Sequence, residues 1–195
     1  MSSRQYITKA IVCGSKANMT SDKSYLLFTE ELGMLWAQAK SVRMEKSKQR
    51  FALQDFSIIR VSLVQGRSTW RIGSVEALSN SFFVSGSRIS RGGVSFIVKK
   101  LRQYVHGETA IPRAFIDAVD SLTALSAEDD VHVMGMYQKV YEFRLLAELG
   151  YIKITNDTRP LIEASSMAKA MEMYDISLDS VVTKGIEHAS QVSHL

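Results

Sequence analysis

Short apolar segments separated by polar turns fill the first 80 residues, and this pattern constrains the fold more than any other feature. Within residues 56–64, Ile59, Val61 and Leu63 alternate with polar or charged residues. A period of two is typical of a half-buried β-strand. Apolar and β-branched runs predict four further strands, at residues 6–13, 25–29, 34–40 and 69–77. Gly14 is the expected end of the first strand. Five short strands in about 75 residues favour a small closed barrel.

The periodicity becomes helical after about residue 79. Apolar side chains recur at three- and four-residue intervals from Arg91 to Val105, which predicts an amphipathic helix. Pro112 suits the first turn of a second helix that runs to about Leu125. Ser126 precedes three acidic residues and is the expected N-cap of a third helix, which should end near Gly150. Two more helices are expected, at residues 165–174 and 178–192.

These patterns predict an α+β chain with a barrel domain at residues 1–80 and an all-α domain at residues 81–195. Cys13 is the only cysteine, so neither an intrachain disulfide nor a thiolate zinc site can form. No apolar run is long enough for a signal peptide or a membrane span. We therefore expect a cytoplasmic protein with no membrane partner.

Residues 40–50 hold five basic side chains and one acidic side chain, a net charge of +4 that equals the formal net charge of the whole chain. The segment lacks an apolar face and lies between two predicted strands, which indicates an exposed cationic loop for a polyanion. A solvated surface turn is the alternative, but five cations favour phosphate contact. The candidate cations are Lys40, Arg43, Lys46, Lys48 and Arg50, with Arg67 and Arg71 in the last hairpin.

Aromatic residues in the same half supply surfaces on which bases can stack, at about 1–3 kcal/mol for each base. Most rings of so small a barrel must belong to its core, and Trp36 is included with the seven cations as a candidate DNA contact. No segment resembles a helix placed to read a major groove, so backbone contacts without sequence preference are expected. The candidate rings are Tyr25, Phe28, Trp36, Phe51, Phe56 and Trp70.

Catalytic signatures are missing from the sequence, which has no His-Glu-x-x-His, no Walker-type loop and no Gly-x-Ser-x-Gly. The helix macrodipole explains acidic residues 128–130 in a first turn better than a metal site does. Cys13 is expected to be a small buried residue, because no histidine is near enough in sequence to activate it. We therefore predict neither an enzyme, nor a cofactor, nor a small-molecule substrate.

Several segments, taken in order, resemble the bacterial recombination mediator family RecO. Residues 6–12 are similar to the first strand of that family, and Asp22 matches an acidic residue in its first loop. The other similar segments are residues 26–33 (second strand and turn), 39–43 and 47–50 (basic loop), 53–57 (the end of that loop) and 141–151 (the long helix of the C-terminal domain).

This resemblance implies an N-terminal OB barrel followed by a helical domain. It also implies a nucleoid-associated protein that binds single- and double-stranded DNA, anneals strands coated with single-strand binding protein, and loads recombinase together with RecR. Many members carry a cysteine zinc site after the Leu-Gly-Tyr motif, whereas residues 152–157 here contain no cysteine, so we expect no zinc.

The chain also looks short at its C-terminal end, where the family makes further contacts. Four basic residues could receive the acidic tail of single-strand binding protein, or could form a solvated helix face: Lys99, Lys100, Arg102 and Arg113. Two other functions stay open from sequence alone. One is an adaptor whose helical domain binds a protein partner while the barrel is structural, and the other is an RNA-binding OB module.

Overall fold

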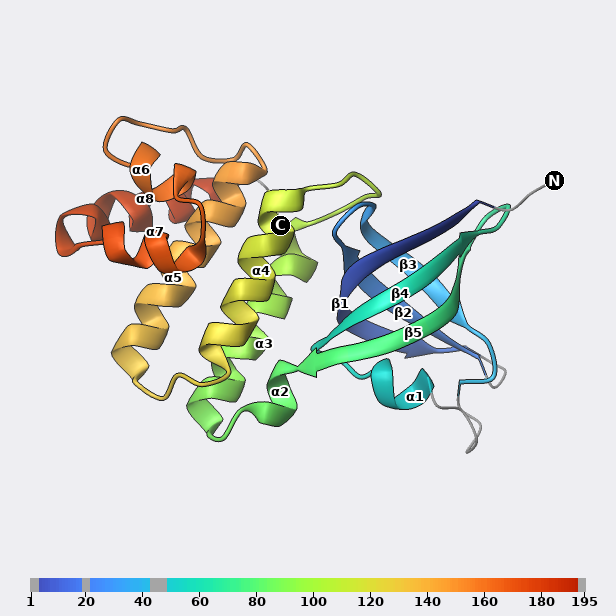
Figure 1. Cartoon of the computed structure of the whole chain (residues 1–195). Helices are drawn as coiled ribbons and strands as arrows, with labels where there is room; N and C mark the ends of the chain where they lie inside the picture. Colours follow the sequence, from blue (N-terminus) through green and yellow to red (C-terminus); the bar gives the residue numbers. More distant parts are fainter. Residues whose placement is uncertain (1–3, 19–21, 43–48, 193–195) are drawn as a thin grey trace. The chain divides into compact units, whose positions relative to one another are not determined.

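The computed structural model describes residues 4–18, 22–42 and 49–192. The chain forms two compact units, each of which is discontinuous in sequence. One unit comprises residues 1–84 and 106–112, and the other comprises residues 85–105 and 113–195. Figure 1 shows that the first unit holds the strands and that the second is helical.

Five strands make up the sheet of the first unit: β1 (Gln5–Ala17), β2 (Lys23–Thr29), β3 (Gly33–Ala39), β4 (Ser57–Gln65) and β5 (Trp70–Asn80). They pair in the order β1-β2-β3-β5-β4, and β4 also pairs with β1, so that the sheet closes into a barrel. The β3–β5 pair is parallel and the other four pairs are antiparallel. A five-stranded mixed sheet followed by helices confirms the predicted α+β class and is consistent with an OB-like fold.

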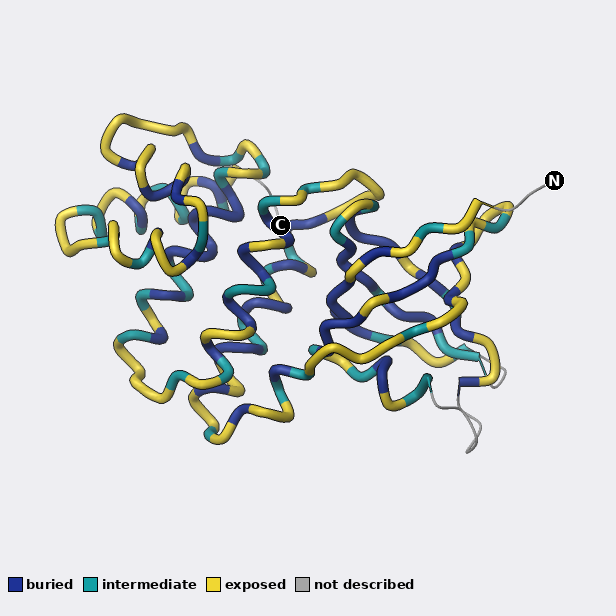
Figure 2. Tube along the Cα trace, in the orientation of Figure 1, coloured by how far each residue is buried: buried dark blue, intermediate teal, exposed yellow. Residues whose placement is uncertain are grey.

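Alternation along the strands separates an apolar interior from an outer surface, as Figure 2 shows along the chain. The ring of Tyr6 meets that of Trp70 edge to face, with the ring centroids 5.5 Å apart. Such aromatic pairs add to the stability gained from burial. The buried residues of this core are Ala10, Val12, Tyr25, Leu27, Leu35, Ala37, Ala39, Val42, Leu53, Ile59, Val61, Leu63, Trp70 and Ile72.

The expected end of the first strand at Gly14 is wrong. The β1 strand continues to Ala17, and its register with β2 shifts between Val12 and Gly14. A bulge of this kind bends a strand without ending it, and glycine is well suited to one. The extension brings Ser15 and Lys16 into the sheet, opposite Tyr25 and Ser24.

The sequence predicted that residues 40–50 form an exposed loop without an apolar face, and the structure differs from this prediction. Val42 is buried in the barrel core, and Gln49 and Arg50 begin the short helix α1 (Gln49–Ala52). That part of the prediction is wrong, because Val42 within the segment packs into the core and residues 49–50 are helical. Arg43, Lys46 and Lys48 lie outside the described residues.

A second segment, residues 106–112, completes the barrel unit beside the β2–β3 turn. The backbone N–H of Met34 donates a hydrogen bond to the carbonyl of Gly107, at 3.0 Å. Gly33 has a φ of +71°, and a Cβ added there would stand 2.3 Å from the carbonyl oxygen of Thr109. Both the turn and this close approach therefore require glycine.

A short helix, α2 (Ser81–Val84), follows β5 within the barrel unit. The remaining helices are α3 (Arg88–Tyr104), α4 (Pro112–Leu125), α5 (Val131–Glu148), α6 (Arg159–Glu163), α7 (Met167–Met173) and α8 (Ile176–Val192). The helix predicted at residues 112–125 has the bounds of α4. None of the helices in the described part of the chain is both long enough and apolar enough to cross a membrane.

Asp130 caps α5, so the predicted cap at Ser126 is wrong. Its carboxylate accepts hydrogen bonds from the backbone N–H groups of His132 and Val133, at 2.7 and 3.1 Å, and these bonds lower the pKa of Asp130. The acidic residues therefore precede the helix instead of filling its first turn. A carboxylate satisfies free N–H groups at a helix start as well as serine does.

A buried ion pair ties together three helical segments of the second unit. Arg144 of α5 binds Asp117 of α4 through two parallel hydrogen bonds, of 2.9 and 3.0 Å. Its guanidinium also donates to the carbonyls of Leu161, Ile162 and Ala164 in and after α6. The Arg144 side chain is 2% exposed, so its charge depends on these partners rather than on water.

Replacing Arg144 with methionine should lower the free energy of unfolding by about 3–5 kcal/mol, because it leaves the Asp117 carboxylate buried without its partner. Arg159→Met is the matched control, since Arg159 forms an exposed i,i+4 pair with Glu163 and should change stability by less than about 0.5 kcal/mol. Urea unfolding of both variants measures the difference. Equal losses of stability in the two variants would contradict this account of the buried pair.

Candidate nucleic-acid interface

The outer face of β2 and β3 carries an exposed tryptophan. Trp36 is 43% exposed and pairs across the sheet with Leu26, whereas its chain neighbours Leu35 and Ala37 point into the core. Gln38 follows on the same outer side, opposite Ser24. A large ring left in water on a sheet surface provides a flat stacking surface.

One cation lies over this ring, and a second lies on the strand next to β3. The ammonium of Lys16, on β1, lies 4.2 Å from the centroid of the Trp36 ring. Arg71, on β5, is exposed and pairs with Gln38 through the parallel β3–β5 ladder. An exposed ring on a sheet face that also carries cations combines base stacking with phosphate attraction. We call this surface the outer platform, formed by Lys16, Leu26, Trp36, Gln38 and Arg71.

Two more predicted cations lie at the borders of the outer platform. Lys40 is exposed and directly follows β3. Arg67 is exposed in the β4–β5 turn, which the hydrogen bond from the Gly66 N–H to the Thr69 carbonyl closes at 3.0 Å. This turn leads straight into Trp70, whose backbone pairs with Ala37 beside Trp36.

Arg50 lies on the short helix α1. Its guanidinium stands over the exposed ring of Phe51, 4.7 Å from the ring centroid. The structure thus places Trp36 and Arg71 on the same outer side of neighbouring strands, Lys40 and Arg67 at the ends of those strands, and Arg50 in the lining of a cleft. Three candidate rings are buried, Tyr25, Phe28 and Trp70, and of these Tyr25 lines the cleft described next.

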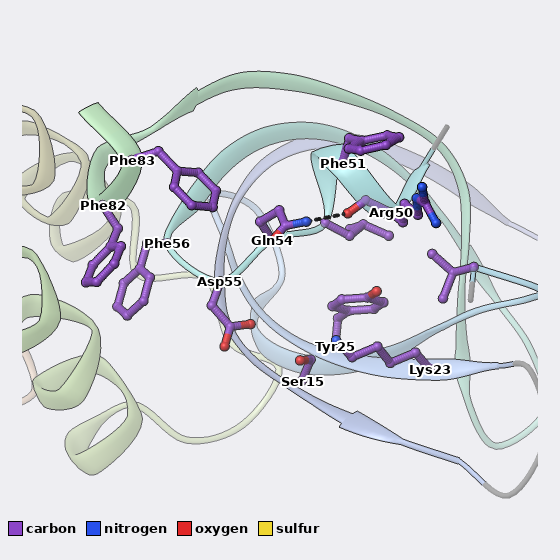
Figure 3. A pocket seen from close by; sticks show the side chains of 12 residues that line it. Ser15, Lys23, Tyr25, Arg50, Phe51, Gln54, Asp55, Phe56, Phe82 and Phe83 are labelled. Carbon is purple, nitrogen blue, oxygen red and sulfur yellow. Dashed lines mark hydrogen bonds between the residues drawn. The ribbon is translucent and has the colours of Figure 1, made fainter. Parts of the chain in front are cut away.

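A cleft of about 590 Å³ lies where α1 approaches the ends of β1 and β2 (Figure 3). Burial, and secondarily the negative charge of Asp55, raises the pKa of Tyr25 to about 12, so the phenol stays neutral at physiological pH. Phe56 stacks on Phe82 with the ring centroids 4.9 Å apart. The lining residues are Ser15, Lys23, Tyr25, Val42, Arg50, Phe51, Leu53, Gln54, Asp55, Phe56, Phe82 and Phe83.

Sequence reasoning missed Lys16, Gln38 and Lys23. Lys16 and Lys23 belonged to a segment predicted as a polar loop, and only the extension of β1 shows that Lys16 faces Trp36. Among the described residues, no group of three or more His, Cys, Asp or Glu side chains is arranged to hold a metal ion. Cys13 is buried, and its thiol donates a hydrogen bond to the carbonyl of Ile11 at 3.6 Å.

The chain was compared with protein-family models and with proteins of known name. No protein-family model matches the chain. Three proteins named DNA repair protein RecO are similar to it: those of Dehalococcoides mccartyi strain 195 (27% identity over 144 residues), Clostridium novyi strain NT (26% over 147) and Dehalococcoides mccartyi strain CBDB1 (28% over 144). The chain is RecO-like. Each match covers 74% of this chain and 56% of the relative, so the RecO-like chain spans about half the length of these relatives.

The exposure of Trp36 and the charge of Lys16 beside it predict how anionic and cationic quenchers affect its fluorescence. Because Lys16 lies over its ring, iodide should quench Trp36 fluorescence more strongly than caesium does, whereas buried Trp70 should be quenched weakly by both. Trp36→Phe should remove most of the quenchable emission, and Lys16→Glu should reverse the preference for iodide. Stern–Volmer titrations measure both effects. Equal quenching of Trp36→Phe and Trp70→Phe would contradict the described placement of the two rings.

Proposed function

We propose that this chain is a non-enzymatic DNA-binding protein that holds single-stranded DNA on the outer platform and promotes strand annealing. The observation that carries the proposal is the exposed Trp36 ring under Lys16, on the outer face of a closed five-stranded sheet where Arg71 pairs with the nearby Gln38. Bases stack on the ring while the cations neutralise phosphates. Neither contact depends on base identity, so binding is independent of sequence.

The strand order supports identifying the barrel as an OB fold. In OB folds, the face of strands 2 and 3 and the adjoining β1–β2 and β4–β5 loops bind oligonucleotides. Here Trp36 and Gln38 lie on that face, Lys16 lies near the first loop, and Arg67 lies in the second. We accordingly propose that residues 1–80 form an OB-fold nucleic-acid-binding domain, which residues 81–84 and 106–112 complete, and that the rest of residues 81–195 form a helical domain.

The physical basis of annealing is charge neutralisation. Two single strands repel each other through their phosphates, and a cationic surface lowers this repulsion. A strand held mainly through its backbone and a few stacked bases keeps most base edges free for pairing. The cations of residues 40–50 add to the positive field, with Lys40 and Arg50 described in the structure and Arg43, Lys46 and Lys48 outside the described residues.

The relatives extend the proposal to recombinational repair. They are named DNA repair protein RecO, and on the strength of that similarity we propose double-stranded DNA, single-strand binding protein and RecR as further partners. The corresponding activity is recombinase loading in the cytoplasm, at the nucleoid. A pull-down of the full chain with each of the two proteins tests these partners separately from DNA binding.

Substitutions on the outer platform test DNA binding. Trp36→Ala should weaken binding of a fluorescent single-stranded oligonucleotide about five-fold or more, because it removes the stacking surface. Arg71→Gln should lower the slope of log affinity against log salt by about 0.7, the value for one lost phosphate contact on a single strand. Lys9→Gln is the matched control, since Lys9 is exposed on the outer side of the β1–β4 pair, opposite Arg60.

The annealing rate of complementary oligonucleotides should fall in the order of the measured affinities. If Trp36→Ala and Arg71→Gln bind as Lys9→Gln does, the outer platform is not the binding surface. Partner capture by a chain without measurable DNA affinity would instead support an adaptor. A clear preference for single-stranded RNA over DNA of the same sequence would support an RNA-binding module.

A further inference from the structure

The cleft beside α1 presents a surface that the outer platform does not use. Figure 3 shows it from close by: Phe51 and Arg50 lie on one wall, while Tyr25 and Lys23 lie on the opposite wall. Each wall combines an aromatic ring with a cation. The Arg50 guanidinium lies 4.7 Å from the Phe51 ring centroid, and the Lys23 ammonium lies 5.2 Å from that of Tyr25.

Two phenylalanines that line the cleft are exposed, Phe51 (66%) and Phe83 (67%), and Phe51 is the one with a cation, Arg50, over its ring. Leaving an apolar ring of this size in water costs stability that burial would recover. The preceding Arg50 places a cation over the ring, and the following turn of chain packs Ala52 and Leu53 into the barrel unit. Because Ala52 and Leu53 are buried, the backbone at Phe51 is fixed and its side chain stays exposed at the cleft.

Polar groups between the walls restrict the kind of ligand that fits. The Gln54 amide donates to the Arg50 carbonyl at 3.0 Å, which fixes its side chain in the cleft. Asp55 adds a carboxylate beside Tyr25. A carboxylate repels a strongly acidic peptide, but it accepts hydrogen bonds from the exocyclic amine of a base. The ring surface suits the face of a base, the two cations suit a phosphate, and the carboxylate suits the exocyclic amine of a base.

The register of β1 and β2 connects the cleft to the outer platform. Lys16 pairs with Ser24 on the outer side, whereas Lys23 pairs with Ala17 and turns its ammonium toward the ring of Tyr25. Consecutive positions on a strand point to opposite faces. The two lysines therefore lie on opposite faces of one strand pair, at neighbouring positions of its register.

We propose that the cleft is a second nucleic-acid site that binds one unpaired nucleotide of single-stranded DNA, with its base against Phe51 and its phosphate at Arg50 and Lys23. The inference rests on the proposed function, since it extends the path of the strand held on the outer platform. The cleft volume of about 590 Å³ lies in the range of small-ligand sites. A base inside a duplex cannot enter without leaving its stack, so this site favours single strands over duplexes.

The test compares two substitutions of Phe51 in the full chain. Phe51→Leu keeps an apolar side chain but removes the ring, and should weaken binding of a fluorescent single-stranded oligonucleotide about five-fold or more. Phe51→Tyr keeps the ring and should bind as the unchanged protein does. Affinity for a blunt duplex should stay within two-fold in both variants. Because Phe51 is exposed, both variants should unfold at the temperature of the unchanged protein.

Photo-crosslinking with an oligonucleotide that contains 5-iodouracil supplies a direct readout, and the cross-linked peptide should contain Phe51. If Phe51→Leu binds single strands normally while Trp36→Ala does not, the second site is refuted and the proposed function stands. If neither substitution matters, both fail. Binding of a synthetic aspartate-rich peptide that Phe51→Leu abolishes, without any loss of DNA binding, would also overturn the inference in favour of a peptide site.

Discussion

The parallel pairing of β3 with β5 is the contact on which the barrel unit depends. Ala37 pairs with Trp70 and Gln38 pairs with Arg71, and these pairs close a sheet that would otherwise have two open edges. On the inner side, the closure buries Trp70 against Tyr6 in the core. On the outer side, it brings Arg71 beside Gln38 of β3, two residues from the exposed Trp36. The same short ladder therefore completes both the hydrophobic core and the candidate interface, because successive residues point to opposite faces.

Strand alternation also explains why one small barrel presents two separate surfaces. The β1–β2 pair carries Lys16 on its outer side and Lys23 toward the cleft, while α1 supplies Arg50 and Phe51 from a different part of the chain. Each surface combines rings with cations, and neither contains a helix that could read base edges in a major groove. Such surfaces hold a flexible strand through phosphates and stacked bases. A strand held in this way remains available for pairing with its complement, which is what annealing requires.

The sequence predicted the strands and most helices because their signals are local. The alternation at residues 56–64 and Pro112 at a helix start need no tertiary contact to be recognised. The exposure of Trp36 could not be predicted, since Met34 is equally apolar and occupies the same outer side but is buried. Helix α1 has only four residues, too few for a periodic pattern. The cleft was missed because its walls come from segments far apart in sequence, which only the closed sheet brings together.

Mapping a bound single strand onto the folded chain tests the central claim most directly. The measurement is a titration of the isotope-labelled protein, 21.8 kDa in mass, with a short single-stranded oligonucleotide, followed by the shifts of its amide and indole NMR signals. The account predicts that the Trp36 indole N–H and the amides of Lys16 and Arg71 shift most, while those of Lys9 and Arg60 on the β1–β4 side stay in place. The account would be contradicted if the shifted signals were confined to residues 113–192, or if no signal of the barrel unit shifted at saturating DNA.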